Sequence, residues 1–229
     1  MHSFHLVQVP ARTGARALAR PLRDVPGLRH AETMVTMRLG APVVSPDRLQ
    51  LRRLAVFAAW EDEGALQRFL EQDQLGRELA QGWHVRLEFL RRWGRVRELG
   101  DLPELAGRSD PAEPVVAVTL ARMRLPEVPR FVHWGRPVER LVRDHPATTL
   151  ALAAFRPSRT VSTFSVWRSA REMTGMVHGR TDGSVEAPRR HADAMVERER
   201  RDFHHEFTTL RFRPVSEHGT WEGRRVLPG

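Results

Sequence analysis

One order of predicted elements occurs twice along the chain, and this repeat constrains the fold more than any other feature of the sequence. Alternating apolar and polar residues predict strands, and apolar residues three or four positions apart predict helices. In the first half these patterns predict a strand, a helix, two strands, a helix and a strand, over residues 4–9, 13–25, 29–39, 51–60, 61–82 and 83–93. This βαββαβ order is typical of the ferredoxin-like unit.

The second half repeats the same order with a broken second helix. Strands are predicted over residues 115–123, 147–155, 160–167 and 207–212, and helices over 129–142, 170–177 and 191–205. The two halves match most clearly where Phe57-Ala58-Ala59-Trp60 corresponds to Phe164-Ser165-Val166-Trp167. Each of these segments is a third strand that runs through a tryptophan into the next helix.

We therefore expect an α+β protein made of two tandem ferredoxin-like βαββαβ halves. The N-terminal half spans residues 1–99, a linker rich in proline, glycine and acidic residues spans 100–114, and the C-terminal half spans 115–229 and bears any cofactor. Two such antiparallel sheets commonly close against each other into a dimeric α+β-barrel-like fold. Closure buries the sheet edges and leaves a cavity between sheet and helices.

Missing residue types exclude several kinds of chemistry. The chain contains no cysteine, so disulfides, iron–sulfur clusters, thiolate-ligated haem and thiol nucleophiles are excluded. It also contains no tyrosine, so a phenolate cannot ligate iron. A bound transition metal would have to be held by histidine or a carboxylate.

The net charge of +9 suggests a polyanion partner, but the composition gives a simpler explanation. All 37 basic residues are arginine, and lysine, asparagine, isoleucine and tyrosine are all absent. These four residue types share codons rich in A and T, which points to a GC-rich genome. We therefore expect no nucleic-acid partner. Residues 1–10 lack the pattern of a secretory signal, and we expect a cytoplasmic protein.

The C-terminal third carries a family resemblance. Its motifs are Phe203-His204-His205-Glu206-Phe207, Leu210-Arg211-Phe212-Arg213 and His218-Gly219-Thr220-Trp221-Glu222-Gly223, preceded by Phe164-Ser165-Val166-Trp167 and His191-Ala192-Asp193-Ala194-Met195. Together these segments resemble the spheroidene monooxygenase family of carotenoid ketolases and hydroxylases. The resemblance is specific over roughly the last 70 residues and diffuse before them.

The resemblance implies a haem-dependent monooxygenase of the dimeric α+β-barrel superfamily. Such an enzyme would bind haem b, use dioxygen and an external electron donor, and act on a small hydrophobic substrate, and a homodimer is plausible. Two alternatives stay open, because one scaffold hosts many activities. In the first alternative the chain is a haem-dependent lyase or dehydratase, and in the second it is a ligand-binding barrel without a cofactor.

His191 is the first choice for the axial iron ligand, because the resemblance places it at the family's histidine position. The loop 178–190 is longer than in the family, and this makes His178 the competing ligand. Met195, Phe203, Trp167 and Phe164 are expected to contact the cofactor from an apolar pocket, and they are equally compatible with ordinary core packing. His204 and His205 are expected to end the helix 191–205, where a cation complements the helix dipole.

Overall fold

A computed structural model describes residues 1–20, 22, 24–41, 49–157, 159–178, 196 and 200–228. His191 and Met195 lie outside these described residues. The strands are β1 (His2–Gln8), β2 (Leu28–Met37), β3 (Leu49–Trp60), β4 (Trp83–Arg95), β5 (Val115–Met123), β6 (Thr148–Arg156), β7 (Thr160–Trp167) and β8 (His204–His218). The helices are α1 (Ala11–Ala19), α2 (Glu63–Gln72), α3 (Gln74–Ala80), α4 (Val128–Asp144) and α5 (Ala170–Val177), with short 3-10 turns η1 (Arg97–Leu99) and η2 (Leu125–Glu127).

The strands close into an antiparallel barrel in the order β1-β3-β2-β6-β7-β5-β8-β4. The first four strands of the chain are neighbours in it, and so are the last four. Two seams join these groups. The β4–β8 seam pairs 84–95 with 207–218, whereas the β2–β6 seam pairs Val35–Met37 with Ala153–Phe155. The expected closed barrel is confirmed, and closure leaves no open sheet edge.

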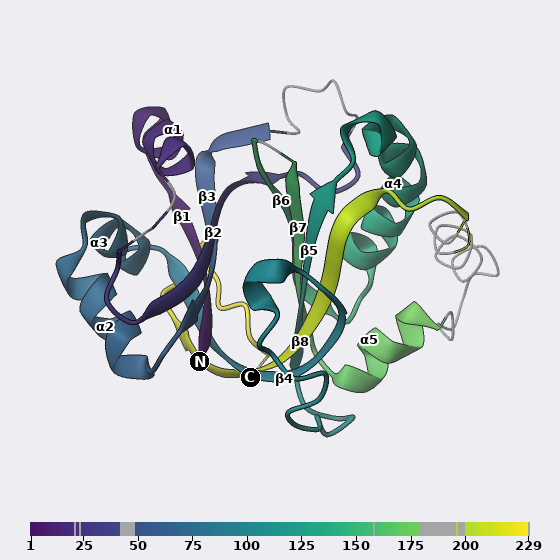
Figure 1. The fold of residues 1–229 in the computed structure, drawn as a ribbon. Helices are drawn as coiled ribbons and strands as arrows, with labels where there is room; N and C mark the ends of the chain where they lie inside the picture. The colour runs from purple at the N-terminus through teal and green to yellow at the C-terminus, as the bar shows by residue number, and fades with distance from the viewer. Residues whose placement is uncertain are drawn as a thin grey trace.

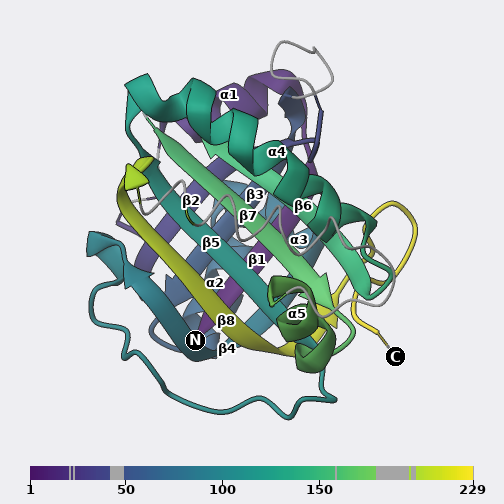
Figure 2. The same ribbon diagram turned by 90° about the vertical axis from the view of Figure 1, so that its right-hand side faces the viewer.

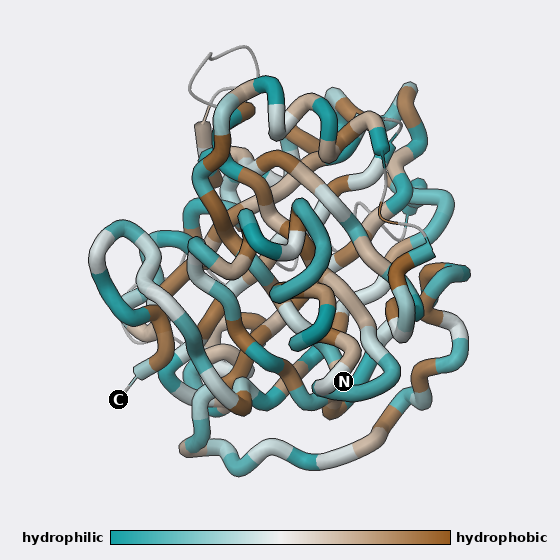
Figure 3. The backbone as a smooth tube through the Cα atoms, turned by 90° about the vertical axis from the view of Figure 1, so that its left-hand side faces the viewer, coloured by the Kyte–Doolittle hydropathy of each residue, from teal (hydrophilic) through white to brown (hydrophobic). Residues whose placement is uncertain are grey.

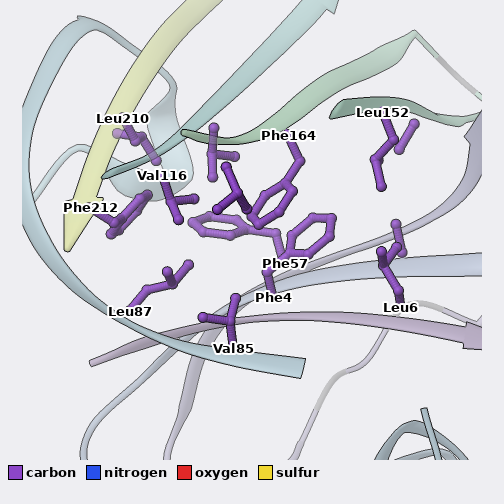
Figure 4. Close-up of a cluster of buried hydrophobic side chains, with 14 of the residues drawn as sticks. Phe4, Leu6, Phe57, Val85, Leu87, Val116, Leu152, Phe164, Leu210 and Phe212 are labelled. Atoms are coloured by element: carbon purple, nitrogen blue, oxygen red, sulfur yellow. The ribbon is translucent and has the colours of Figure 1, made fainter. Parts of the chain in front are cut away.

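Alternate residues of every strand fill the barrel interior. Figure 4 shows labelled side chains such as Phe4, Phe57 and Phe164 from different strands pointing toward one another. Phe4 of β1 stacks on Phe164 of β7 with ring centroids 3.7 Å apart, and both side chains are buried. An aromatic pair of this kind adds about 0.5–1.5 kcal/mol beyond the burial of its area. The interior is therefore a packed core.

Helices α1, α2 and α3 cover the outer face of the first four strands (Figure 1). Asp62 caps α2 by accepting a hydrogen bond from the amide of Ala65, and Asp73 caps α3 by accepting from Leu75 and Gly76. In Figure 3, where this side faces the viewer, apolar and polar stretches alternate along the chain. The apolar helix residues pack on the sheet as one continuous cluster with the outward residues of β1 and β3.

Helices α4 and α5 lie over the outer face of the last four strands (Figure 2). Ser169 caps α5 by accepting from the amide of Glu172. α4, all of whose residues are described, contains no fully buried side chain. None of the helices in the described ranges has the length and apolar composition needed to cross a membrane.

The last strand differs from its prediction. β8 begins at His204 and ends at His218, so His204 and His205 belong to a strand and not to the end of a helix. His204 pairs with Met123 of β5, and the far end of β8 pairs with β4. Pairing with neighbours on both sides extends the strand beyond what its local sequence indicates.

Candidate functional site

The outer face of β5–β8 carries short side chains at its centre. Two rows cross the four strands, because their members are direct cross-strand partners: Thr209, Thr119, Thr163 and Ala153 in one row, and Arg211, Ala117, Ser165 and Ala151 in the other. The hydroxyls of Thr119 and Thr209 lie 3.4 Å apart. Ala117, Ala151 and Thr163 are half-buried. We call the threonine, serine and alanine residues of these rows the small-residue floor; Arg211, at the β8 end of the second row, is not part of it.

Apolar clusters flank the small-residue floor at both ends. At one end Met173 of α5 packs with Trp167 and Val115 of the sheet. At the other end Phe203 packs with Met123, and Phe131 of α4 lies against them. The equivalent face of the first half is filled by one continuous cluster instead. The outer face of the second half therefore carries separate apolar clusters, with small and hydroxyl-bearing side chains between them.

The structure brings some of the predicted site residues to this face and not others. Trp167 lies at one end, where its indole N–H donates to Ser165 Oγ at 2.9 Å. Phe203 lies at the other end, with the guanidinium of Arg130 4.3 Å above its ring. Phe164 points into the barrel and stacks on Phe4, so it does not share a pocket with the other two. The expectation of one pocket containing all three is wrong.

The histidines that follow α4 and α5 have different free nitrogens when their rings are neutral. His178 follows α5, and its Nδ1 donates to the carbonyl of Thr174 at 2.8 Å. Its Nε2 therefore keeps a lone pair, which is the tautomer of a metal-ligating histidine oriented by a backbone carbonyl. His145 Nδ1 accepts from the amide of Ala147 at 3.1 Å, so its Nε2 carries the proton when the ring is neutral. Burial lowers the pKa of His145.

A buried carboxylate lies inside the barrel and was not recognised in the sequence. Glu32 pairs across strands with Phe57, which points inward, and its side chain is fully buried. His30 Nε2 donates to Glu32 Oε1 at 3.1 Å, Arg156 Nη2 lies 3.0 Å from Glu32 Oε2, and Arg122 also bonds the carboxylate. Burial alone would raise the pKa of Glu32, but these partners lower it to about 2.

At neutral pH Glu32 is thus a paired anion and not a proton donor or acceptor. We interpret the group as a structural ion network in the barrel interior. Its signal in the sequence is a glutamate two positions before Met34, on the face of the strand that builds the core.

Three histidines line up side by side across β1, β4 and β8, and we call them the histidine row. His5 is the direct partner of His84, and His84 of His218, with ring centroids 5.0 Å and 4.7 Å apart. The rings stack, so their nitrogens do not converge on one point. Within the described ranges no three histidine or carboxylate side chains are placed to hold a metal ion.

No family model and no curated protein sequence matches the chain. Several solved structures resemble it. A candidate monooxygenase from Fusobacterium nucleatum is 8% identical, with 96% of this chain and 94% of that chain covered and a TM-score of 0.39. An anthrone oxidase-like protein is 12% identical, with 100% and 95% covered and a TM-score of 0.35. The haem-degrading enzyme of Listeria monocytogenes is 10% identical, with 91% and 98% covered and a TM-score of 0.29. Likenesses of this size assign neither a family nor an activity.

Proposed function

We propose that this chain is a haem-dependent, monooxygenase-like enzyme that acts on a small hydrophobic molecule and resembles spheroidene monooxygenase. The observation that carries the proposal is the small-residue floor between two apolar clusters. A planar macrocycle would lie on short side chains and meet apolar contacts at its rim, and the small-residue floor with its two flanking clusters supports this proposal. The C-terminal motifs that resemble the spheroidene monooxygenase family add support from the sequence.

The residues of this chain fit haem b in part by their chemistry. His191 is the first-choice ligand suggested by the resemblance, and His178, whose Nδ1 donates to the carbonyl of Thr174, is the competing ligand. Trp167, Phe203 and Met195 would supply apolar contacts. Bound haem would supply the activation of dioxygen, with electrons from an external donor. The protein's own contribution would be to orient the imidazole and exclude water from the floor.

The remaining features of the proposal rest on the sequence patterns and on the family resemblance. The chain would consist of two tandem ferredoxin-like halves, 1–99 and 115–229, with the cofactor on the second. It would work in the cytoplasm and would form a homodimer, without a nucleic-acid partner.

Haemin titration followed by absorption spectroscopy tests the proposal. We expect a saturable Soret band that shifts on reduction and again with carbon monoxide. Thr119→Trp places a large ring at the centre of the floor and should abolish the band, whereas Leu51→Trp, at an exposed position of β3, should not. Equal haem binding by both variants would refute the floor as the haem site.

Variants of the two candidate ligands identify the axial histidine. His178→Ala or His191→Ala should lose the band, and His205→Ala, at an exposed position of β8, is the matched control. A protein that takes up no haemin at all would instead be a cofactor-free binding barrel. A haem protein that turns over its substrate without dioxygen would be a lyase or dehydratase.

A further inference from the structure

A cavity of about 790 Å³ lies at the β2–β6 seam. The two strands stop pairing after Met37, and residues 38–39 diverge from 148–152 of β6. The C-terminal tail, residues 221–228, forms the remaining wall. This volume falls within the range of about 300–1,000 Å³ that is typical of small-molecule sites. Ala151 is the single residue that this cavity shares with the small-residue floor.

The tail is fixed in place by specific contacts. Glu217 Oε1 accepts from the indole N–H of Trp83 at 2.7 Å and from the amides of Val226 and Leu227. Burial would raise the pKa of Glu217, but these hydrogen bonds lower it, so the carboxylate is ionised. Trp221 and Arg224 exchange two backbone hydrogen bonds, of 2.9 and 3.2 Å. The wall that the tail provides is therefore part of the folded structure.

Guanidinium groups from five parts of the chain line this cavity. They come from the end of β2, from β3, from the end of α4, from the residue after β7 and from the tail: Arg38, Arg53, Arg143, Arg168, Arg224 and Arg225. Glu222 is the single carboxylate among the lining residues. Residues so far apart in sequence converge because the barrel closes, which distinguishes this cluster from a run of basic residues on one surface segment.

Half of these arginines have a carboxylate partner. Arg53 pairs with Glu222 at 2.8 Å, Arg143 binds Asp144 through two bonds of 2.7 and 2.8 Å, and Arg225 lies 3.1 Å from Glu217. Within the part of the chain that the structure describes, Arg38, Arg168 and Arg224 have no carboxylate within 4.0 Å. The cavity therefore carries excess positive charge.

Apolar side chains also line the cavity. Leu150 and Leu152 of β6, with Trp221 and Val226 of the tail, belong to the barrel core and also line the cavity. The guanidinium of Arg53 lies 5.4 Å from the centre of the Trp221 ring. A ligand here would meet both guanidinium groups and apolar side chains.

We propose that this cavity binds a small organic anion that carries two or more carboxylate or phosphate groups. Guanidinium groups bind both kinds of oxyanion through paired hydrogen bonds. Several separated guanidiniums favour a ligand with several anionic groups, and the apolar side chains favour one with a carbon skeleton. The enclosure by the tail favours a small molecule over a polymer.

Calorimetric titration of the full chain at low salt tests the proposal, with citrate as the carboxylate probe and pyrophosphate as the phosphate probe. We expect saturable binding of at least one of the two, and the stronger of them identifies the oxyanion class. Arg168→Ala and Arg224→Ala should each weaken that binding about tenfold, because each removes a charge-assisted contact. Both substitutions leave the backbone bonds of these residues intact.

Arg12→Ala, at an exposed position of α1, removes the same charge away from the cavity and should leave the affinity unchanged. Arg168→Lys should restore part of the affinity. Three results would overturn the proposal: no saturable binding of either probe, an equal loss in Arg12→Ala, or tighter binding of a short oligonucleotide that Arg12→Ala weakens as much as Arg168→Ala.

Discussion

Acid should weaken the fold through the histidine row, and His84 at its centre gives the clearest measure of this effect. Its ring stacks between those of His5 and His218, and in the described structure its Nδ1 is buried without a hydrogen-bond partner. His84→Phe keeps an aromatic ring in the stack and removes the titrating group. The variant should therefore fold at neutral pH and respond less to acid.

The size of the effect follows from the pKa of His84. Burial first, then the charges of His218 and Arg86, lower this pKa from 6.5 to about 4. The unfolded chain takes up the proton first as the pH falls, so the contribution to stability is complete above pH 6.5 and is lost towards pH 4. Between pH 7 and pH 5 this amounts to about 2 kcal/mol, which solvent screening reduces to about 1 kcal/mol.

Urea denaturation at pH 7, 6 and 5 gives the free energy of unfolding of wild type and of His84→Phe. The difference in their loss of stability with falling pH is the contribution of His84. His2 and His5 have lowered pKa values too, so His84→Phe should retain part of the acid dependence. Glu32 does not interfere, because its contribution is lost only as the pH falls from 4.5 towards 2. His205→Phe, at an exposed position of β8, is the matched control. An identical loss of stability in wild type and His84→Phe would refute the reasoning.

Three further substitutions test the barrel by urea denaturation. Phe164→Ala should cost about 3–5 kcal/mol by opening a cavity beside Phe4, and similar stability to wild type would contradict the stacked core. Glu32→Gln removes the buried anion that pairs with Arg122 and Arg156, although Arg122 keeps Glu98, and should cost about 3 kcal/mol, unlike the exposed control Glu88→Gln. Gly94→Ala should lower the free energy of unfolding more than Gly223→Ala does. Both glycines have positive φ, but of the two only an added Cβ at Gly94 would meet a backbone atom, the carbonyl oxygen of Phe207 at 2.3 Å.

Much of the barrel follows from local patterns in the sequence. Strands such as 160–167 alternate clearly, and their predicted bounds agree with β7. The start of β8 does not follow from them, because His204 joins a strand through its partner Met123 on β5. A contact between residues this far apart has no local signal. The cavity at the β2–β6 seam has no local signal in the sequence either, because its arginines converge only when the barrel closes.

The candidate site was predictable in part. Trp167 and Phe203 flank the small-residue floor, whereas Phe164 does not belong with them. The spacing already indicates this outcome: residues three apart in a strand point to opposite faces, so Phe164 and Trp167 cannot share one pocket. The buried role of Glu32 is also implied by its even spacing from Met34. Its partners Arg122 and Arg156 come from other strands and are not indicated by the sequence.

The two halves differ at the positions where their third strands correspond. Val56 and Ala58 of β3 face the helices from the first half and are buried. Their counterparts on β7 are Thr163 and Ser165, nearly equal in volume but carrying a hydroxyl in place of a methyl group or hydrogen. A hydroxyl in a packed apolar layer costs free energy unless it is hydrogen-bonded. The tryptophans at the ends of the two strands, Trp60 and Trp167, are the same residue type. The difference between the outer faces of β3 and β7 is therefore limited to the middle of the strands. The outer face of β7 thus carries hydroxyls at positions where the outer face of β3 is apolar, and the Ser165 hydroxyl is satisfied by the indole N–H of Trp167.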